Sequence, residues 1–283
     1  MMTNANVLLV TAHPDDECLF FLPTLLSLLR RGLNVHVLCL SSGDFYGLGE
    51  IRRAEFHRSC AAIGVAPECS QVVDDPQLRD GPKSVWPPEA IAFIVGGYVR
   101  TNRINVIVTF DEGGVSGHPN HCAIVGGIRL LLQKSLQKQR DGAHSMGHVD
   151  CMVLETTCSM RKYLGIADIP YSWFQNRNLE TRLRERETDH EVKFTKVGQS
   201  STSLLSTVST MYTCRPSDII TSICALLAHH SQLVWYRILF VIFARYTYTN
   251  TLRQLSPDWE GDLGRPRFSC SNTASYRQSD KKD

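Results

Sequence analysis

The chain has 283 residues, 43% of them apolar, which is enough to bury a substantial core in one large domain. Its 30 basic and 28 acidic residues leave a formal net charge of +2, which excludes a general affinity for nucleic acid. Ten cysteines are scattered without a Cys-x-x-Cys pair, and no apolar signal peptide precedes the first predicted strand, so we expect a reducing, cytosolic environment.

Short apolar strands alternate with longer helices along most of the chain. The predicted strands are NVLLV (6–10), NVHVLCL (34–40), INVIVTF (104–110) and VDCMVLETT (149–157). The predicted helices cover residues 18–31, 48–64, 87–102 and 118–137. Because the strands are apolar on both faces, we predict an α/β fold, a Rossmann-like three-layer sandwich with a mainly parallel sheet and helices on both faces.

Two polar stretches follow predicted strands. TAHPDDE comes after the first strand and DEGGVSGHPNH after the third, so both lie at the carboxyl edge of the sheet, where ligands bind in such folds. Imidazole and carboxylate groups together suit zinc, and three protein ligands leave a position for water. The sequence therefore predicts a catalytic metal site drawn from five residues, which are His13, Asp15, Asp16, His118 and His121.

Each cluster alone also has a purely structural explanation. Acidic residues in a first helical turn complement the helix dipole, which would suffice for Asp15, Asp16 and Glu17. His118 and His121 could be ordinary loop histidines. Their expected meeting at one edge of the sheet favours the metal site.

The stretches AHPDDE and GVSGHPNH resemble the LmbE-like, or PIG-L, superfamily of zinc-dependent de-N-acetylases. Four longer stretches are similar to the eukaryotic branch, which acts on N-acetylglucosaminyl-phosphatidylinositol in GPI-anchor synthesis: VTFDEGGVSGHPNH, GEIRRAE, RKYLGIADIP and HHSQLVWYRILFVIFARY. The resemblance covers about residues 7–252, apart from one insertion. It implies an LmbE-like fold and hydrolysis of this glycolipid to glucosaminyl-phosphatidylinositol and acetate, the second step of GPI-anchor biosynthesis.

The resemblance also assigns roles to the five polar residues. It implies that His13, Asp16 and His121 bind a divalent metal, Zn²⁺, and that Asp15 is the catalytic base. It places His118 against the developing oxyanion, where a protonated imidazole would stabilise the negative charge. An open zinc site can both polarise an amide carbonyl and activate water, which amide hydrolysis requires.

One position bears on the protonation of His118. Bacterial relatives often have an aspartate between the two histidines, whereas this chain has Asn120, as the eukaryotic branch does. An amide cannot raise the basicity of a histidine as a carboxylate would. We therefore expect another acid to support His118, with Asp111 and Glu112 as candidates.

The stretch GEIRRAE begins a helix after a glycine-bearing loop at the same edge of the sheet. Arg52 matches an arginine that the resemblance links to substrate binding, and its guanidinium could contact the sugar or the phosphate. The alternative is that Arg52, Arg53 and Glu55 form a solvated helix face.

Residues 232–248 form an aromatic, apolar segment interrupted by Arg237 and Arg245. It is too short and too charged to span a bilayer comfortably, so it is either an interfacial helix in peripheral contact with the membrane or a helix closing the core. Both could hold. The resemblance implies a glycolipid substrate at the cytoplasmic face of the endoplasmic reticulum membrane. Relatives commonly begin with a transmembrane anchor that this chain lacks, so either its N-terminus is shortened or attachment comes from the C-terminal segment and from partners.

The expected organisation is one catalytic domain over residues 1–252. A charged and then serine- and threonine-rich stretch at about 175–212 predicts a surface insertion, and residues 253–283 predict a polar, disordered tail.

Two other functions remain open beside the glycolipid deacetylase. The near alternative is a zinc deacetylase of a soluble N-acetylated sugar, against which the aromatic segment argues. The distant alternative is a non-catalytic scaffold with the same fold. A nucleotide-binding oxidoreductase is weaker still, since no Gly-x-Gly-x-x-Gly follows the first strand.

Overall fold

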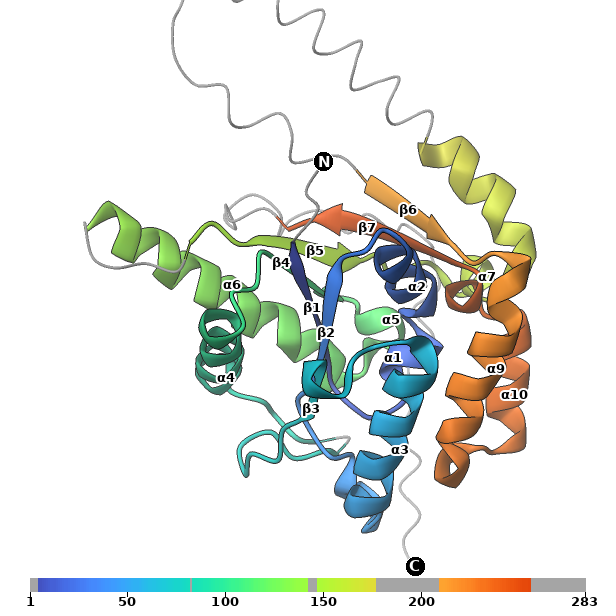
Figure 1. The fold of residues 1–283 in the computed structure, drawn as a ribbon, viewed down its shortest axis with the longest axis horizontal. Coiled ribbons are helices and arrows are strands. Elements are labelled where there is room, and N and C mark those ends of the chain that lie inside the picture. The colour runs from blue at the N-terminus through green and yellow to red at the C-terminus, as the bar shows by residue number, and fades with distance from the viewer. Residues whose placement is uncertain (1–4, 82, 142–146, 177–208, 256–283) are drawn as a thin grey trace, which may run out of the picture.

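A mixed β-sheet runs through the middle of the protein (Figure 1). The computed structural model describes residues 5–81, 83–141, 147–176 and 209–255. Within these residues the sheet has seven strands in the order β3-β2-β1-β4-β5-β7-β6. The strands are β1 Asn6–Thr11, β2 Asn34–Cys39, β3 Ser70–Val72, β4 Val106–Phe110, β5 Asp150–Leu154, β6 Ser209–Thr213 and β7 Thr249–Gln254.

The first five strands are parallel, and β7 runs in the opposite direction. Val7 of β1 pairs with Val35 of β2 on one side and with Val106 of β4 on the other, and β4 pairs in parallel with β5. Strand β7 lies antiparallel between β5 and β6. The prediction of a mainly parallel α/β sheet is confirmed, and the carboxyl ends of β1, β2 and β4 share one edge.

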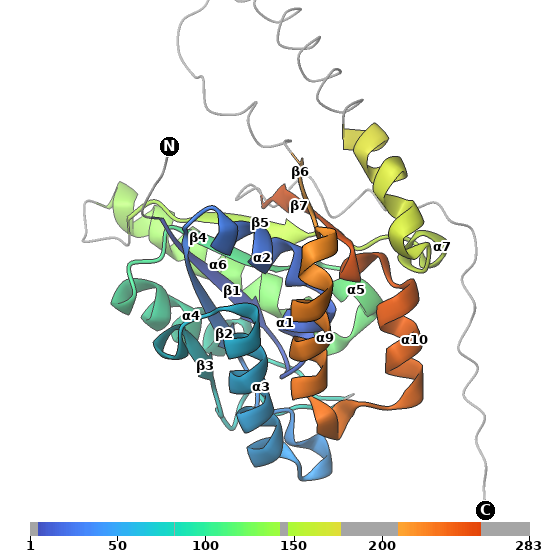
Figure 2. The ribbon, with the colours of Figure 1, turned by 45° about the vertical axis from the view of Figure 1, so that its right-hand side comes forward.

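Helices cover both faces of this sheet. Helices α4 and α6 pack against each other on one face, and α2, α3 and α9 lie on the other, as Figures 1 and 2 show. A side chain at Gly127 of α6 would place its Cβ 2.4 Å from Cβ of Ile91, so glycine permits the close approach of α4 and α6. The α-helices are α1 Asp16–Leu19, α2 Leu22–Arg30, α3 Gly49–Ile63, α4 Pro88–Thr101, α5 Gly114–Gly117, α6 Pro119–Arg140, α7 Ser159–Lys162, α9 Ile219–Ala228 and α10 Trp235–Phe243, and residues 168–176 are also helical.

Short 3₁₀ turns connect several of these elements. They are η1 Asp44–Tyr46, η2 Pro67–Cys69, η3 Gly165–Ala167, η5 Pro216–Asp218, η6 His230–Gln232 and η7 Arg245–Thr247. The turns η3 and η7 contact each other. Between them, the fully buried guanidinium of Arg245 lies 2.7 Å from the Asp168 carboxylate. The stretches RKYLGIADIP and HHSQLVWYRILFVIFARY thus meet in a buried ion pair, which fixes the C-terminal segment to the body of the protein.

The single helix predicted over residues 18–31 is wrong, because the structure has a break at Phe20 and Phe21 between α1 and α2. Pro23 has no N–H to donate to the carbonyl four residues earlier, so a continuous helix would lose a hydrogen bond here. The Phe20 carbonyl instead accepts a hydrogen bond of 2.8 Å from Nδ2 of Asn250 in β7. The break therefore anchors β7, the strand between β5 and β6.

Part of the predicted organisation lies outside the described residues. Residues 177–208 of the predicted insertion and 256–283 of the predicted tail are not described. The last residues of the predicted insertion belong to the edge strand β6, and the first of the predicted tail close β7.

The aromatic segment folds as α10 followed by η7. On α10, Arg237, Phe240 and Val241 face inward, and the outward side chains are about half or more exposed, namely Trp235, Tyr236, Ile238, Leu239, Ile242 and Phe243. No helix in the described part of the chain is long and apolar enough to cross a membrane.

Candidate metal centre

Three predicted ligands converge where β1 and β4 end. Nε2 of His121 lies 3.3 Å from Nδ1 of His13 and 3.3 Å from Oδ1 of Asp16. Nδ1 of His13 lies 4.0 Å from Oδ2 of Asp16. All three side chains are buried. The short helices α1 and α5, which belong to the two ligand loops, lie side by side in both views (Figures 1 and 2).

Two of these separations match a tetrahedral metal ion, and the third, between His13 and Asp16, is wider and involves the other carboxylate oxygen. Ligand atoms at about 2.0–2.1 Å from zinc are separated from one another by about 3.3 Å in a tetrahedron. Two imidazole nitrogens and a carboxylate oxygen, brought together without a lysine or arginine between them, form a donor set that zinc accepts. The residues present therefore fit a divalent metal with one coordination position left for another group.

The far sides of both imidazoles are held by hydrogen bonds. Nδ1 of His121 donates to the Gly114 carbonyl at 3.1 Å, which leaves Nε2 with its lone pair toward the centre. Nε2 of His13 lies 3.0 Å from the carboxylate of Asp80, which leaves Nδ1 facing the centre. A carboxylate that orients a ligating histidine is typical of metal sites. Asp80, in the loop after β3, was not predicted from the sequence.

Asp16 is organised by backbone groups as well as by its neighbours. Its Oδ2 accepts hydrogen bonds from the N–H groups of Ala12 at 3.0 Å and of His13 at 2.9 Å. Burial raises the pKa of the Asp16 carboxyl. The neighbouring His121 and His13 and the backbone hydrogen bond from His13 lower it by more, so the pKa of Asp16 lies well below its usual value. Asp16 is therefore a carboxylate at neutral pH, as a metal ligand must be.

His118 stands beside the three ligands and is only partly buried. Its ring centre is 4.9 Å from that of His13 and 5.0 Å from that of His121. Ring nitrogens of all three histidines lie within 4.8 Å of one another, so His118 could also ligate a metal. Its Nδ1 is buried and has no hydrogen-bond partner among the described residues. Burial, together with His13 and His121, lowers the pKa of His118.

The acids predicted to support His118 lie elsewhere, so that expectation is wrong. Asp111 accepts hydrogen bonds from Gly113 at 3.0 Å and from the backbone of Thr156 at 2.7 Å, so it shapes the loop. Glu112 pairs with Arg253 at 2.6 Å. The carboxylates that raise the pKa of His118, against the larger effect of burial, are those of Asp16 and Asp80. Asn120 contacts His13 at 3.1 Å.

Asp15, the predicted base, has an unusual backbone conformation. Its φ of 114° lies in a region that non-glycine residues rarely adopt, which costs on the order of 1–3 kcal/mol. Its backbone N–H donates to Glu17 at 3.0 Å. Its carboxylate is paired with the guanidinium of Arg237 and lies 3.4 Å from that of Arg52. Asp15 is thus held beside the metal ligands by residues of three different elements.

Arg52 of α3 bridges the loops that surround Asp15. Its guanidinium donates to the carbonyl oxygens of Gly43 and Pro14, each at 2.8 Å. A Cβ at Gly43 would lie 2.4 Å from Nη1 of Arg52, and Gly43 also has a φ of +67°, so this position requires glycine. Arg52 lies at the predicted site, and its predicted contact with substrate stays a prediction.

A buried network joins α1 to the start of the C-terminal segment. Oε1 of Glu17 accepts hydrogen bonds from Ser59 at 2.6 Å and from His229 at 2.6 Å. Ser231 donates to Glu55 of α3 at 2.6 Å. Glu17, Cys18 and His229 could be grouped as a second set of metal ligands, but the hydrogen bonds of Glu17 already account for its burial. We therefore assign this network a positioning role.

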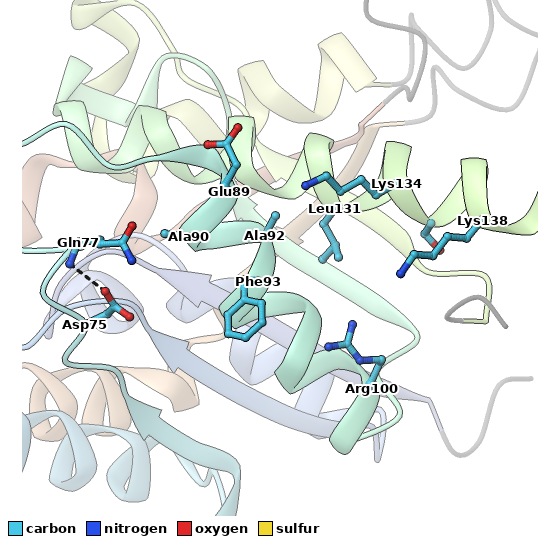
Figure 3. A pocket seen from close by; sticks show the side chains of 11 residues that line it. Asp75, Gln77, Glu89, Ala90, Ala92, Phe93, Arg100, Leu131, Lys134 and Lys138 are labelled. Atoms are coloured by element: carbon cyan, nitrogen blue, oxygen red, sulfur yellow. Dashed lines mark hydrogen bonds between the residues drawn. The ribbon is translucent and has the colours of Figure 1, made fainter. Parts of the chain in front are cut away.

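A cavity of about 700 Å³ lies away from these residues, between α4 and α6 (Figure 3). Its lining includes Phe93, Arg100, Lys134 and Lys138, and it contains no histidine or cysteine. The metal ligands do not contribute to it, so it provides no chemistry for the candidate site.

Comparisons with known proteins agree with this arrangement. A family model described as PIG-L, GlcNAc-PI de-N-acetylase, matches residues 8–130. The N-acetylglucosaminyl-phosphatidylinositol de-N-acetylase of Bos taurus is 34% identical, over 89% of this chain and 84% of its own. A protein of Dictyostelium discoideum with the same name, marked probable, is 30% identical over 88% of this chain and 93% of its own.

A bacterial relative matches a smaller part. The 1D-myo-inositol 2-acetamido-2-deoxy-alpha-D-glucopyranoside deacetylase of Thermobifida fusca is 28% identical over 42% of this chain and 51% of its own. Its name describes an N-acetylated glucosamine joined to inositol, without a lipid.

Solved structures with this fold include enzymes of different reactions. N,N'-diacetylchitobiose deacetylase from Pyrococcus horikoshii has a TM-score of 0.56 at 13% identity, over 89% of this chain and 84% of its own. The 4-carboxy-2-hydroxymuconate hydratase GalB from Pseudomonas putida has a TM-score of 0.54 at 12% identity, over 89% of this chain and 97% of its own. These similarities support the fold, and the reaction has to be inferred from the site.

Proposed function

The chain belongs to the PIG-L family, and from this premise we propose that it removes the acetyl group of N-acetylglucosaminyl-phosphatidylinositol by zinc-dependent hydrolysis. The products are acetate and glucosaminyl-phosphatidylinositol, so the reaction is the second step of GPI-anchor biosynthesis. The observation that carries the proposal is the convergence of His13, Asp16 and His121 with Asp15 beside them, in a chain that matches the glycolipid enzymes over most of its length.

The extent of the match separates two candidate substrates. The bovine glycolipid enzyme covers 89% of this chain, whereas the bacterial sugar-inositol deacetylase covers 42%. The substrates in the names of these two enzymes differ by the phosphatidyl group. The larger coverage therefore favours the glycolipid over a soluble N-acetylated sugar.

The residues of the site can divide the proton transfers between them. Zinc, when bound to the three ligands, would polarise the acetyl carbonyl and make water nucleophilic at neutral pH. Asp15 accepts a proton from the water whose oxygen adds to the acetyl carbon. His118, whose pKa is lowered in the free protein, would have to take up a proton before it stabilises the oxyanion and gives that proton to the glucosamine nitrogen as the C–N bond breaks. Acetate and the free amine are the products.

The surface beside the site suits a substrate embedded in a membrane. The outward side chains of α10 are apolar or aromatic, such as Trp235 and Ile238, which are 74% and 50% exposed. Aromatic and aliphatic side chains of this kind lie at the boundary between headgroups and acyl chains. We infer peripheral contact through residues 232–248, at the cytoplasmic face of the endoplasmic reticulum membrane.

The proposal is tested by measuring free amine and acetate released by the zinc-loaded protein. The probes are N-acetylglucosaminyl-phosphatidylinositol in detergent micelles and free N-acetylglucosamine at the same concentration. We expect release from the glycolipid and at most a trace from the free sugar. Equal release from both would make the protein a general sugar deacetylase. No release from either, with zinc bound, would favour a non-catalytic scaffold.

A further inference from the structure

Arg237 reaches the predicted catalytic base from the far end of the chain. It lies on the inner side of α10, and its Nη1 pairs with Oδ2 of Asp15, 222 residues away in sequence. A quarter of its side chain is exposed to solvent. Among the described residues, Asp15 is the one hydrogen-bond partner that the structure gives the Arg237 guanidinium, so most of the N–H donors of this group are available to a ligand.

Arg52, the other arginine of the site, already has hydrogen-bond partners for its guanidinium. Arg52 donates to two backbone carbonyls, those of Gly43 and Pro14, and its side chain is only 8% exposed. Turning Arg52 toward a ligand would break both hydrogen bonds and leave buried carbonyls without partners. Arg237 can turn away from Asp15 at the cost of a single ion pair, so it is the better placed of the two arginines to take an anion.

The surroundings of Arg237 match the order of groups in the proposed substrate. On one side lie Asp15 and the metal ligands, where the acetamido sugar must react. On the other side is the apolar outer face of α10, which includes Tyr236, Ile238 and Leu239, exposed by 57%, 50% and 44%. In the glycolipid a negatively charged phosphodiester separates the sugar and inositol from the acyl chains. Arg237 is the cation at the corresponding boundary of the protein.

We propose that Arg237 recognises the phosphodiester of the glycolipid and exchanges partners when the substrate binds. In the free protein its guanidinium pairs with Asp15. In the complex it donates two hydrogen bonds to the phosphate oxygens, a geometry that guanidinium and phosphate favour. The phosphodiester thereby replaces Asp15 as the partner of Arg237, whereas a substrate without phosphate leaves the pair with Asp15 intact. This inference rests on the proposed function and names the phosphodiester as the group of the substrate that decides the specificity of the enzyme.

The test compares two substrates that differ only in the phosphatidyl group, namely N-acetylglucosaminyl-phosphatidylinositol and N-acetylglucosaminyl-inositol. The proteins are the zinc-loaded wild type, Arg237→Ala, Arg237→Lys and the control Arg58→Ala, which changes an exposed arginine of α3. We expect Arg237→Ala to lower kcat/KM for the glycolipid about 10- to 100-fold, mainly through KM, because the charge-assisted hydrogen bonds to the phosphate are lost. The loss on the phosphate-free substrate should be smaller, because that substrate lacks the group that Arg237 contacts.

The two variants separate charge from geometry. Arg237→Lys keeps the charge but not the two parallel donors, so its loss on the glycolipid should fall between those of the wild type and Arg237→Ala. A loss by the same factor on both substrates would overturn the inference, because Arg237 would then only position Asp15. A wild type that does not prefer the glycolipid would overturn both this inference and the proposed function. The control variant should retain the preference of the wild type.

Discussion

Asp15 has a backbone conformation that is rare for a non-glycine residue, and three neighbouring side chains hold it there. The accepting group for its N–H is Glu17, and its carboxylate lies between Arg52 and Arg237. Replacement of Asp15 by asparagine keeps the shape and removes the basicity of the side chain. We expect kcat to fall about 10²–10⁴-fold, as for loss of a general base. Metal analysis should show the wild-type content, and a variant with full activity would show that Asp15 is not the base.

His118 immediately precedes α6 and His121 lies in its first turn, but the two histidines should behave differently. His121→Ala removes a nitrogen that lies 3.3 Å from both other ligand atoms, so we expect loss of bound metal as well as of activity. His118→Ala should lose activity and keep the metal. Metal content measured after dialysis against a weak chelator distinguishes them. Equal loss of metal from both variants would make His118 a fourth ligand.

Asp80 orients His13 from behind, at 3.0 Å from its Nε2. The change Asp80→Asn removes the negative charge that raises the basicity of the ligand, so metal affinity should fall about 10–100-fold. Competition with a fluorescent zinc chelator measures this affinity. The variant Asp74→Asn, in the same loop and with a side chain that is 69% exposed, serves as the control. An unchanged affinity in Asp80→Asn would exclude this role.

Sequence reasoning predicted that the candidate ligands lie together and missed the residues that support them, for a physical reason. His13, Asp16 and His121 lie in compact motifs whose strands end at one edge of the sheet, so pattern and topology suffice to bring them together. Asp80 and Arg237 carry no local pattern, because an isolated aspartate in a loop or arginine in a helix is usually solvated. Only the folded structure shows that they contact His13 and Asp15.

At the level of elements, the contact between α1 and the C-terminal end of α9 depends on one buried pair. His229 and Glu17 are almost fully buried and lie 2.6 Å apart. Burial lowers the pKa of His229, but the Glu17 carboxylate, with Asp15 and Glu55 nearby, outweighs burial and raises it above its usual value. Loss of one partner from such a pair costs about 3–5 kcal/mol, so His229→Gln should lower the free energy of unfolding by that order.

The same pair predicts a pH dependence with a definite sign. Because the pKa of His229 is raised in the folded protein, its contribution is fully present below the unfolded value of about 6.5 and is lost as pH rises through the folded value. The difference in unfolding free energy between the wild type and His229→Gln should therefore shrink above neutral pH. Urea denaturation at several pH values measures it. The exposed neighbour His230 provides the control, and a difference independent of pH would contradict the ion pair.

How well each strand was predicted depends on how distinct its apolar pattern is. Four of the five parallel strands are buried apolar runs, and they were predicted within one or two residues at most ends. Strand β3 has three residues, and β6 reads STMYT beside a serine- and threonine-rich stretch, so neither has a distinct apolar pattern. Strand β7 reads TNTLRQ and was also missed. These strands form through pairing with their neighbours, which local sequence does not reveal.

At the scale of the whole molecule, the apolar outer face of α10 lies on the side of the sheet away from α4 (Figure 2). Ile238 and Ile242 are about half exposed, so aspartate at both positions should leave the fold intact. We expect binding to phosphatidylcholine vesicles to fall about tenfold or more, since burying one such side chain is worth about 1.5–3 kcal/mol. Vesicle sedimentation measures the binding.

A matched change on the opposite side controls for general effects of charge. Phe93 of α4 is 79% exposed, and Phe93→Asp should leave vesicle binding unchanged. If Phe93→Asp weakened binding as much as the α10 variant, contact would not be confined to α10. The apolar segment was predicted from its composition, whereas the orientation of its outer face depends on the inward anchor of Arg237 and could not be read from the sequence.

The most direct test of a metal-dependent deacetylase at this centre is a zinc titration of metal-free protein, with acetate release from N-acetylglucosaminyl-phosphatidylinositol measured at each point. Activity should rise in proportion to bound zinc and level off at about one ion per chain. Asp15→Asn should bind the same amount of zinc and release almost no acetate. Acetate release by metal-free protein, or full activity in Asp15→Asn, would contradict the proposed centre and its base.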